Sequence, residues 1–148
     1  MKKKYNIGII ASAFDVFHPG HAMMLKEAKS ICKYLIACIQ IDPSKERSEK
    51  HKPIQGIVER QIILKSIKYV DEIIIYETEK DLYGILKTLK PDVRIMGTDW
   101  KYKKFTGSDL NIPVEWHDRF VHTYSTTNLR ERIWIAENEV RKIDNNNS

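Results

Sequence analysis

The sequence has few of the features that cross-link or anchor small proteins. Its only two cysteines, Cys32 and Cys38, lie in a predicted helix and a predicted strand, which favours small buried side chains over a disulfide framework or a zinc site. No run approaches the roughly eighteen apolar residues that a membrane span needs. The lysine-rich start is followed by a strand-like segment and not by the apolar region of a signal peptide. We therefore expect a cytoplasmic protein without membrane contact.

Size and charge set further limits. With 148 residues and 42% hydrophobic side chains, the chain lies in the range of one compact domain, which we expect over residues 1–143. The asparagine-rich end, residues 144–148, predicts a disordered tail. The net charge of +5 suits nucleic acid, an anionic membrane surface and a phosphorylated small molecule equally well. Charge alone therefore does not identify the partner.

Two kinds of apolar pattern alternate along the chain. Short β-branched runs predict strands, and apolar residues that recur every three or four positions predict the helices between them. This alternation favours an α/β fold: a Rossmann-like open parallel sheet of about five strands with helices on both faces. The predicted strands are 5–11, 34–41, 72–76, 93–96 and 113–116, and the predicted helices begin at residues 19, 57, 82 and about 125, the last with a capping box of Asn128 and Glu131.

Ligands of such folds bind at the carboxyl ends of the strands. We therefore expect the loops after the first, second and fourth strands to converge on one crevice that brings His18, Asp42 and Asp99 together. The loop 44–55 is long, polar and charged, as functional loops often are, and is a candidate lid.

The motif His18-Pro19-Gly20-His21 carries the strongest chemical signal. Two histidines three residues apart at a helix start share one face, and imidazoles beside the leading amides of a helix place partial and full positive charge where a triphosphate would lie. Gly20 lets a phosphate approach. The rival interpretations are a zinc site, for which a third ligand is missing nearby, and histidines with only a structural role.

Four motifs in this order resemble the HxGH nucleotidyltransferase superfamily, in particular its glycerol-3-phosphate cytidylyltransferases. Besides His18 to His21 they are Glu59-Arg60, Met96 to Trp100, and Ser125 to Thr127, and the resemblance covers residues 5–135. It implies transfer of CMP from CTP to a small phosphorylated acceptor, such as glycerol 3-phosphate or a similar polyol or sugar phosphate. Pyrophosphate is released, and Mg²⁺ bound through the nucleotide phosphates is the implied cofactor. The resemblance also suggests a homodimer.

The resemblance assigns roles residue by residue. His18, His21 and Lys52 are the implied catalytic residues, with both imidazoles contacting the phosphates in the transition state. The implied nucleotide-binding residues are Ala13, Phe14, Gly20, Lys50, Arg60, Gly97, Asp99, Trp100, Ser125, Thr126 and Thr127. The alternatives to these roles are solvated lysines, a surface role for Arg60, core packing for Trp100 and simple helix capping by the serine and threonines.

Two departures from the family pattern weaken the glycerol phosphate assignment. Ser12-Ala13-Phe14-Asp15 stands where the family has Gly-Thr-Phe-Asp, so a threonine contact to phosphate is replaced by backbone contacts. Phe120 stands where the family has an arginine, and either Arg119 or His122 is a candidate replacement.

Other functions stay open on the sequence. An adenylyltransferase of the same superfamily, using ATP with a sugar phosphate or flavin mononucleotide, is the main alternative. A nucleic-acid binder is suggested by the basic aromatic stretch 101–105, although no recognised binding motif accompanies it and we expect no nucleic-acid partner. A catalytically silent nucleotide sensor is the last alternative.

Overall fold

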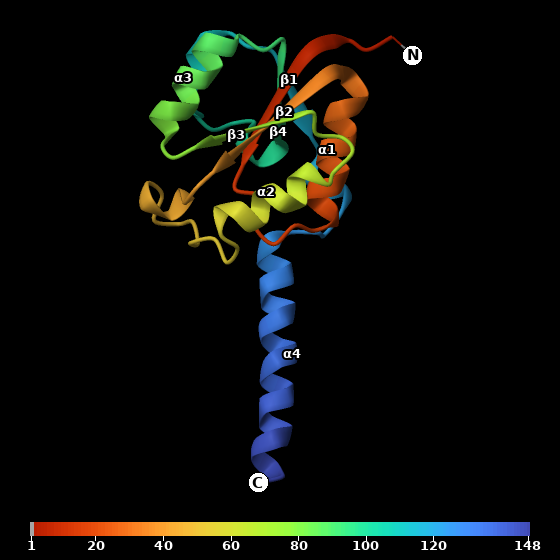
Figure 1. The fold of residues 1–148 in the computed structure, drawn as a ribbon, viewed down its shortest axis with the longest axis vertical. Helices are drawn as coiled ribbons and strands as arrows, with labels where there is room; N and C mark the ends of the chain where they lie inside the picture. The colour runs from red at the N-terminus through yellow and green to blue at the C-terminus, as the bar shows by residue number, and fades with distance from the viewer. Residues whose placement is uncertain (1) are drawn as a thin grey trace.

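The computed structural model describes residues 2–148, which form one five-stranded sheet and the helices around it (Figure 1). All strand pairs are parallel, and the strand order is β3-β2-β1-β4-β5. This confirms the predicted Rossmann-like α/β fold. The strands are β1 (Tyr5–Ser12), β2 (Cys32–Gln40), β3 (Glu72–Tyr76), β4 (Val93–Gly97) and β5 (Val114–His117).

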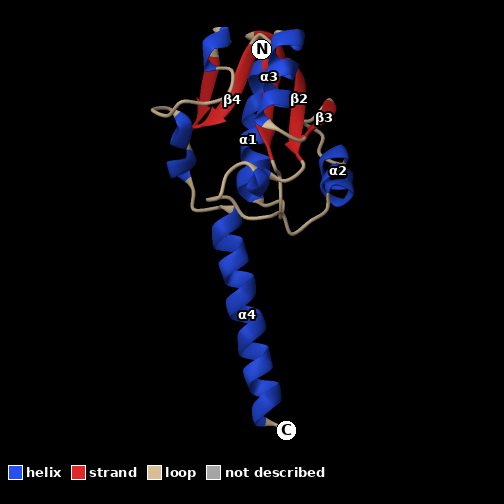
Figure 2. Cartoon of the chain, turned by 90° about the vertical axis from the view of Figure 1, so that its left-hand side faces the viewer, coloured by secondary structure: helices blue, strands red, loops and turns tan. Residues whose placement is uncertain are grey.

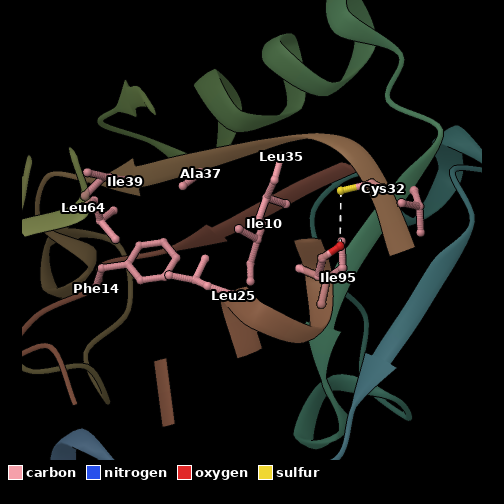
Figure 3. Close-up of a cluster of buried hydrophobic side chains, with 11 residues drawn as sticks. Ile10, Phe14, Leu25, Cys32, Leu35, Ala37, Ile39, Leu64 and Ile95 are labelled. Atoms are coloured by element: carbon pink, nitrogen blue, oxygen red, sulfur yellow. Dashed lines mark hydrogen bonds between the residues drawn. The ribbon is translucent and has the colours of Figure 1, made fainter. Parts of the chain in front are cut away.

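Helices cover both faces of the sheet, as predicted. Alternate residues of a strand point to opposite faces, so Ile10 packs with the buried leucines of α1 (Pro19–Ile31) and α2 (Ile57–Lys65). Its neighbour Ile9 packs on the other face under α3 (Glu79–Leu89). Figure 3 shows the first of these clusters, with Ile10 and side chains from α1, α2 and the neighbouring strands.

Some predicted boundaries are wrong by a few residues. Cys32 belongs to β2 and not to the first helix, because it pairs with Tyr5 in the parallel ladder, and its thiol donates to the carbonyl of Ala28 at 3.2 Å. Helix α3 begins at Glu79, earlier than its apolar pattern, since Thr78 and Asp81 form a capping box there. Helix α2 begins at the predicted Ile57 and ends at Lys65.

The last helix, α4 (Thr126–Asn146), projects away from the sheet and its helices (Figures 1 and 2). Ser125 is its N-cap and accepts from the amide of Asn128 at 3.0 Å, so the predicted capping box of Asn128 and Glu131 is wrong. The tail predicted to be disordered from residue 144 is helical through Asn146, because each added residue of a formed helix gains a backbone hydrogen bond that outweighs weak propensity. Within residues 2–148, no helix combines the length and apolar character that crossing a bilayer requires.

Candidate active site

A cavity of about 1120 Å³ opens at the carboxyl ends of the strands. The loops after β1, β2 and β4 all contribute to its wall, as predicted, and so do the first turns of α1, α3 and α4. Asp42 does not: its carboxylate accepts from the amide and hydroxyl of Ser44 and caps a short helical turn. All five histidines of the chain line this cavity: His18, His21, His51, His117 and His122.

His18 and His21 lie in its wall with their rings stacked, 3.9 Å between centroids. The amide of Gly20 donates to Nδ1 of His18 at 3.0 Å, and the amide of His18 donates to Nδ1 of His21 at 3.3 Å. Since both Nδ1 atoms accept, the proton of each neutral ring is on Nε2. Nε2 of His18 lies 3.2 Å from the hydroxyl of Thr126. The backbone therefore sets both imidazoles as Nε2–H donors.

Burial keeps these two rings neutral. Desolvation, then the positive charge of Arg119, lowers the pKa of His18. For His21, desolvation and the neighbouring His18 lower the pKa to about 3. The predicted positive charge on the imidazoles is therefore wrong near neutral pH: the histidines offer N–H groups. Fixed positive charge in the cavity wall comes instead from other side chains, including Arg47, Arg119 and Arg130.

Gly20 is required by local packing. A Cβ atom at this position would lie 2.8 Å from Cε1 of His18 and 3.0 Å from the carbonyl oxygen of Tyr124. The residue between the two histidines must therefore lack a side chain so that the His18 ring and the segment before α4 can approach. Gly20 also lines the cavity, where a phosphate was predicted to approach it.

The loop after β1 has a strained backbone that is held by the end of the loop 44–55. Phe14 and Val16 have φ values of 50° and 48°, in the left-handed region that is costly for side chains with a Cβ and concentrates at functional sites. The carboxylate of Asp15 accepts from the amides of Ile54 and Gln55, both at 2.9 Å. The candidate lid is thus anchored at its end to the loop that precedes the two histidines.

Arg60 lies behind the cavity wall and does not line it. Its side chain is 2% exposed and makes four hydrogen bonds to backbone carbonyls. Nη1 donates to Ala13 at 2.9 Å and Gln40 at 2.7 Å, Nη2 to Ile41 at 2.6 Å, and Nε to Gln55 at 3.0 Å. The predicted nucleotide contact is therefore not supported by its position; the guanidinium ties the ends of β1 and β2 to the segment before α2.

The other predicted residues divide between the wall and the layer behind it. Lys50 lines the cavity, but Lys52 is exposed outside it. Asp99 and Trp100 line it, and Gly97 lies behind them: a Cβ there would come 2.5 Å from Oδ1 of Asp99. Ala13 and Phe14 also line the wall, the latter with its ring in the core. The structure thus places Lys52 and Gly97 away from direct contact.

The first turn of α4 faces the two histidines. Ser125, Thr126 and Thr127 all line the cavity, and the Ser125 hydroxyl is at the same time the helix cap. Leading amides of a helix attract anions. Capping and phosphate binding, which were alternatives on the sequence, are therefore compatible in this geometry.

The sequence interpretation missed several polar residues of the cavity, among them Arg47, Tyr76, Glu79, Arg94 and His117. His117 ends β5, and its position at the carboxyl end of a strand was the signal that could have identified it. It is 3% exposed, with Nδ1 2.5 Å from Glu27 and Nε2 without a hydrogen-bond partner.

Both candidate replacements for the family's arginine line the cavity. Nη1 of Arg119 lies 3.9 Å from Oδ1 of Asp99. The ring of His122 lies between those of His117 and Tyr124, with centroids 5.7 and 5.4 Å away, and its two nitrogens have no partner. The structure therefore brings both residues to the site and does not choose between them.

The carboxylates near the cavity do not form a metal cage. Within residues 2–148, no group of three or more histidine, cysteine, aspartate or glutamate side chains is arranged to hold a metal ion. Mg²⁺ keeps several waters and is commonly held through substrate phosphates.

Comparison with known proteins places the fold and the motifs in context. The family described as Cytidylyltransferase-like matches residues 9–132. The bifunctional protein HldE of Campylobacter concisus is 32% identical over 142 residues, which is 95% of this chain but only 30% of that protein. The FAD synthase of Thermococcus sibiricus is 34% identical over 103 residues, 69% of this chain and 70% of that one.

Solved structures share the fold. The lipopolysaccharide core biosynthesis protein from Thermoplasma volcanium superposes with a TM-score of 0.62 at 25% identity, covering 82% of this chain and 99% of that one. A pantoate-beta-alanine ligase from Francisella tularensis, in complex with beta-gamma ATP and beta-alanine, gives a TM-score of 0.57 at 17% identity, covering 85% of this chain and 62% of that one. At that identity, the second shows the fold alone.

Proposed function

The chain belongs to the cytidylyltransferase-like family of nucleotidyltransferases, and on that premise we propose that it transfers CMP from CTP to a small phosphorylated acceptor with release of pyrophosphate. One observation carries the proposal: two neutral imidazoles, His18 and His21, with their Nε2–H groups set by the backbone, lie beside the first turn of α4. This arrangement offers hydrogen-bond donors and helix amides to a polyphosphate.

The proposed reaction requires charge stabilisation and little proton transfer. A phosphate oxygen of the acceptor forms a bond to the α-phosphorus as the bond to the β-phosphate oxygen breaks, and pyrophosphate leaves with that electron pair. A phosphate monoester has a second pKa of about 6 and is already largely anionic near neutral pH. The Nε2–H groups of His18 and His21 then donate to oxygens that gain charge in the transition state.

Several cavity residues fit the other parts of CTP. The amides and hydroxyls of Ser125 to Thr127 suit the terminal phosphates, and Asp99 and Trp100 suit the ribose or base by hydrogen bonding and stacking. The unpartnered ring nitrogens of His117 and His122 are buried polar atoms that a nucleotide could satisfy. Mg²⁺, carried by the nucleotide, would neutralise charge on the phosphates.

ATP is the second candidate nucleotide, because the chain covers most of an FAD synthase at 34% identity. An adenylyltransferase with a sugar phosphate or flavin mononucleotide as acceptor would use the same histidines. The acceptor is a proposal in either case, since the chain spans about a third of the length of the HldE proteins it matches.

Pyrophosphate release with CTP and ATP in parallel, across phosphorylated polyols, sugars and flavin mononucleotide, tests the proposal. We expect turnover with CTP in the presence of an acceptor, and a loss of about 10²–10³ in kcat for His18→Ala and for His21→Ala, as for one lost transition-state donor. Thermal unfolding of each variant checks the fold. Wild-type turnover in both folded variants, or no turnover with either nucleotide across the panel, would contradict the proposal.

A further inference from the structure

The cavity extends beyond the residues that the proposed nucleotide uses. The proposed nucleotide-binding residues lie around the first turns of α1 and α4 and the loop after β4. The volume of the whole cavity, about 1120 Å³, exceeds the roughly 300–1,000 Å³ of a typical small-molecule site. The remaining wall lies on the face of the sheet covered by α3, at the ends of β2 and β3. We call it the α3-side pocket, and its polar residues include Gln40, Arg47, Tyr76, Glu79, Arg94 and Thr106.

Arg94 is the central cation of the α3-side pocket. Its side chain is 5% exposed, one Nη1–H donates to the carbonyl of Thr106, and its guanidinium lies 5.3 Å from the centroid of the Phe105 ring. A guanidinium has five N–H donors and stays charged in proteins. None of the ion pairs within residues 2–148 includes Arg94. A buried, unpaired charge is costly unless a ligand completes it.

The Glu79 carboxylate in the same wall is already shared. Oε2 of Glu79 accepts from the hydroxyl of Thr106 at 2.6 Å, and Oε1 lies 3.7 Å from Nη2 of Arg47. Nε of Arg47 is buried without a partner. Glu79 is therefore shared between Thr106 and Arg47, and Arg94 has no ion-pair partner of its own in the described part of the chain.

We propose that the α3-side pocket binds the second substrate and that Arg94 pairs with a carboxylate at the end of the acceptor opposite its reacting phosphate. The reacting phosphate must reach the α-phosphorus beside His18 and His21, so Arg94 under α3 is placed for the far end of the molecule. A planar carboxylate matches the fork of a guanidinium. The inference rests on the proposed nucleotidyl transfer and names its acceptor as a phosphorylated acid in place of a neutral polyol phosphate.

Matched acceptors that differ only at the far end test this pairing. We would measure kcat/KM for glycerol 3-phosphate against 3-phosphoglycerate, and for sorbitol 6-phosphate against 6-phosphogluconate. We expect the acid of each pair to be favoured by roughly 10- to 100-fold, as for one charged hydrogen-bonded contact. Arg94→Met should abolish the preference, so that the acid and the polyol phosphate of each pair react with similar kcat/KM. Arg94→Lys should retain part of the preference.

The acid-to-polyol ratio separates substrate binding from a structural role, because a loosened loop at Thr106 would lower both rates together. Arg141→Met, on the exposed part of α4, is the matched control and should keep the wild-type ratio. If Arg94→Met does not fold, the wild-type ratio still decides. An equal or reversed ratio overturns the inference, whereas no turnover with any acceptor overturns the proposed function itself.

Helix α4 carries a second, independent inference. Leu129, Ile133, Ala136, Val140 and Ile143 recur at alternating steps of four and three, the spacing of a coiled-coil seam. Ile133, Val140 and Ile143 are 52%, 54% and 61% exposed. Figure 2 shows the helix clear of the sheet along most of its length. This apolar face is not buried by the rest of the chain.

The charges beside the seam favour an antiparallel α4 helix of a second copy as its partner. Arg132 flanks the seam in the first half of α4 and Glu139 flanks the same side in the second half. In an antiparallel pair, Ile133 of one copy lies against Ala136 of the other. Arg132 of each copy then faces Glu139 of the other copy, which gives two contacts between opposite charges. In a parallel pair, Arg132 of each copy would face Glu137 of the other, but Glu139 of each copy would face the like charge of Asp144. The sequence of α4 is therefore complementary to its own reverse.

We infer that two copies of this chain associate through an antiparallel pair of α4 helices. Light scattering after gel filtration should give twice the chain mass of 17.4 kDa. Val140→Asp should give monomers, and Glu139→Arg should weaken the dimer at least tenfold. Arg132→Glu combined with Glu139→Arg should restore it, and Lys142→Glu, on the outer face, should not change it. A wild-type monomer, or a double variant as weak as Glu139→Arg, would overturn the inference.

Discussion

His18 and His21 are hydrogen-bond donors because backbone amides fix their tautomers. Nδ1 of His18 accepts from the amide of Gly20 and Nδ1 of His21 accepts from the amide of His18, and burial removes the solvent that would stabilise an imidazolium. The motif predicted a phosphate-binding pair, but the protonation state depended on burial and on neighbouring charges.

The stability of the fold should fall as His21 is driven toward protonation. Its pKa is about 3 in the folded protein, against about 6.5 in the unfolded chain. Between these values the unfolded state binds the extra proton, so the contribution is complete above about pH 6.5 and is lost as the pH falls toward 3. Between pH 7 and pH 5, urea unfolding should show the wild type losing about 2 kcal/mol more than His21→Asn. Parallel losses in the two proteins would rule this out.

Arg60 acts at the scale of the elements, since one side chain on α2 joins the ends of two strands. Its four bonds reach the carbonyls of Ala13, Gln40, Ile41 and Gln55. Without it, these four partly or fully buried carbonyls would lose their hydrogen-bond donor. Sequence patterns cannot reveal this, because an arginine among polar residues at a helix start is equally compatible with the surface.

Replacing Arg60 by Met should therefore destabilise the fold by about 2–4 kcal/mol, as expected when several buried acceptors lose their donor. Lys65→Met, at the exposed end of the same helix, should change stability by less than about 0.5 kcal/mol. Denaturant unfolding measures both variants. Equal stability of the two would show that the carbonyls find other partners.

Only some properties of helix α4 follow from its local sequence. Its start at Ser125 and its apolar face were both predictable, because capping residues and helical periodicity are local properties. Its length was not, since helix continuation through asparagines depends on weak propensities. Its exposure was also unpredictable, because the same stripe suits a core and an intermolecular seam equally well.

At the scale of the whole molecule, the candidate site exists because parallel strands end at one edge. His18 follows β1, Lys50 follows β2, Asp99 follows β4 and Thr126 lies beyond β5, yet all line one cavity. The order of elements was enough to expect this meeting. It was not enough to place Lys52, which is exposed outside the cavity, or Arg60, which lies buried behind its wall.

The linear sequence by itself determined the alternation of strands and helices, the open parallel sheet and the motif between the first strand and helix, because these follow from periodicity and residue type over short stretches. Only the tertiary structure decided which cations face the cavity, which arginine is a structural tie, and that His18 and His21 are neutral donors. Those properties depend on burial and on contacts between segments far apart in the chain. A side chain that lies behind the cavity wall supports the wall, whereas one that lines the wall can contact a ligand.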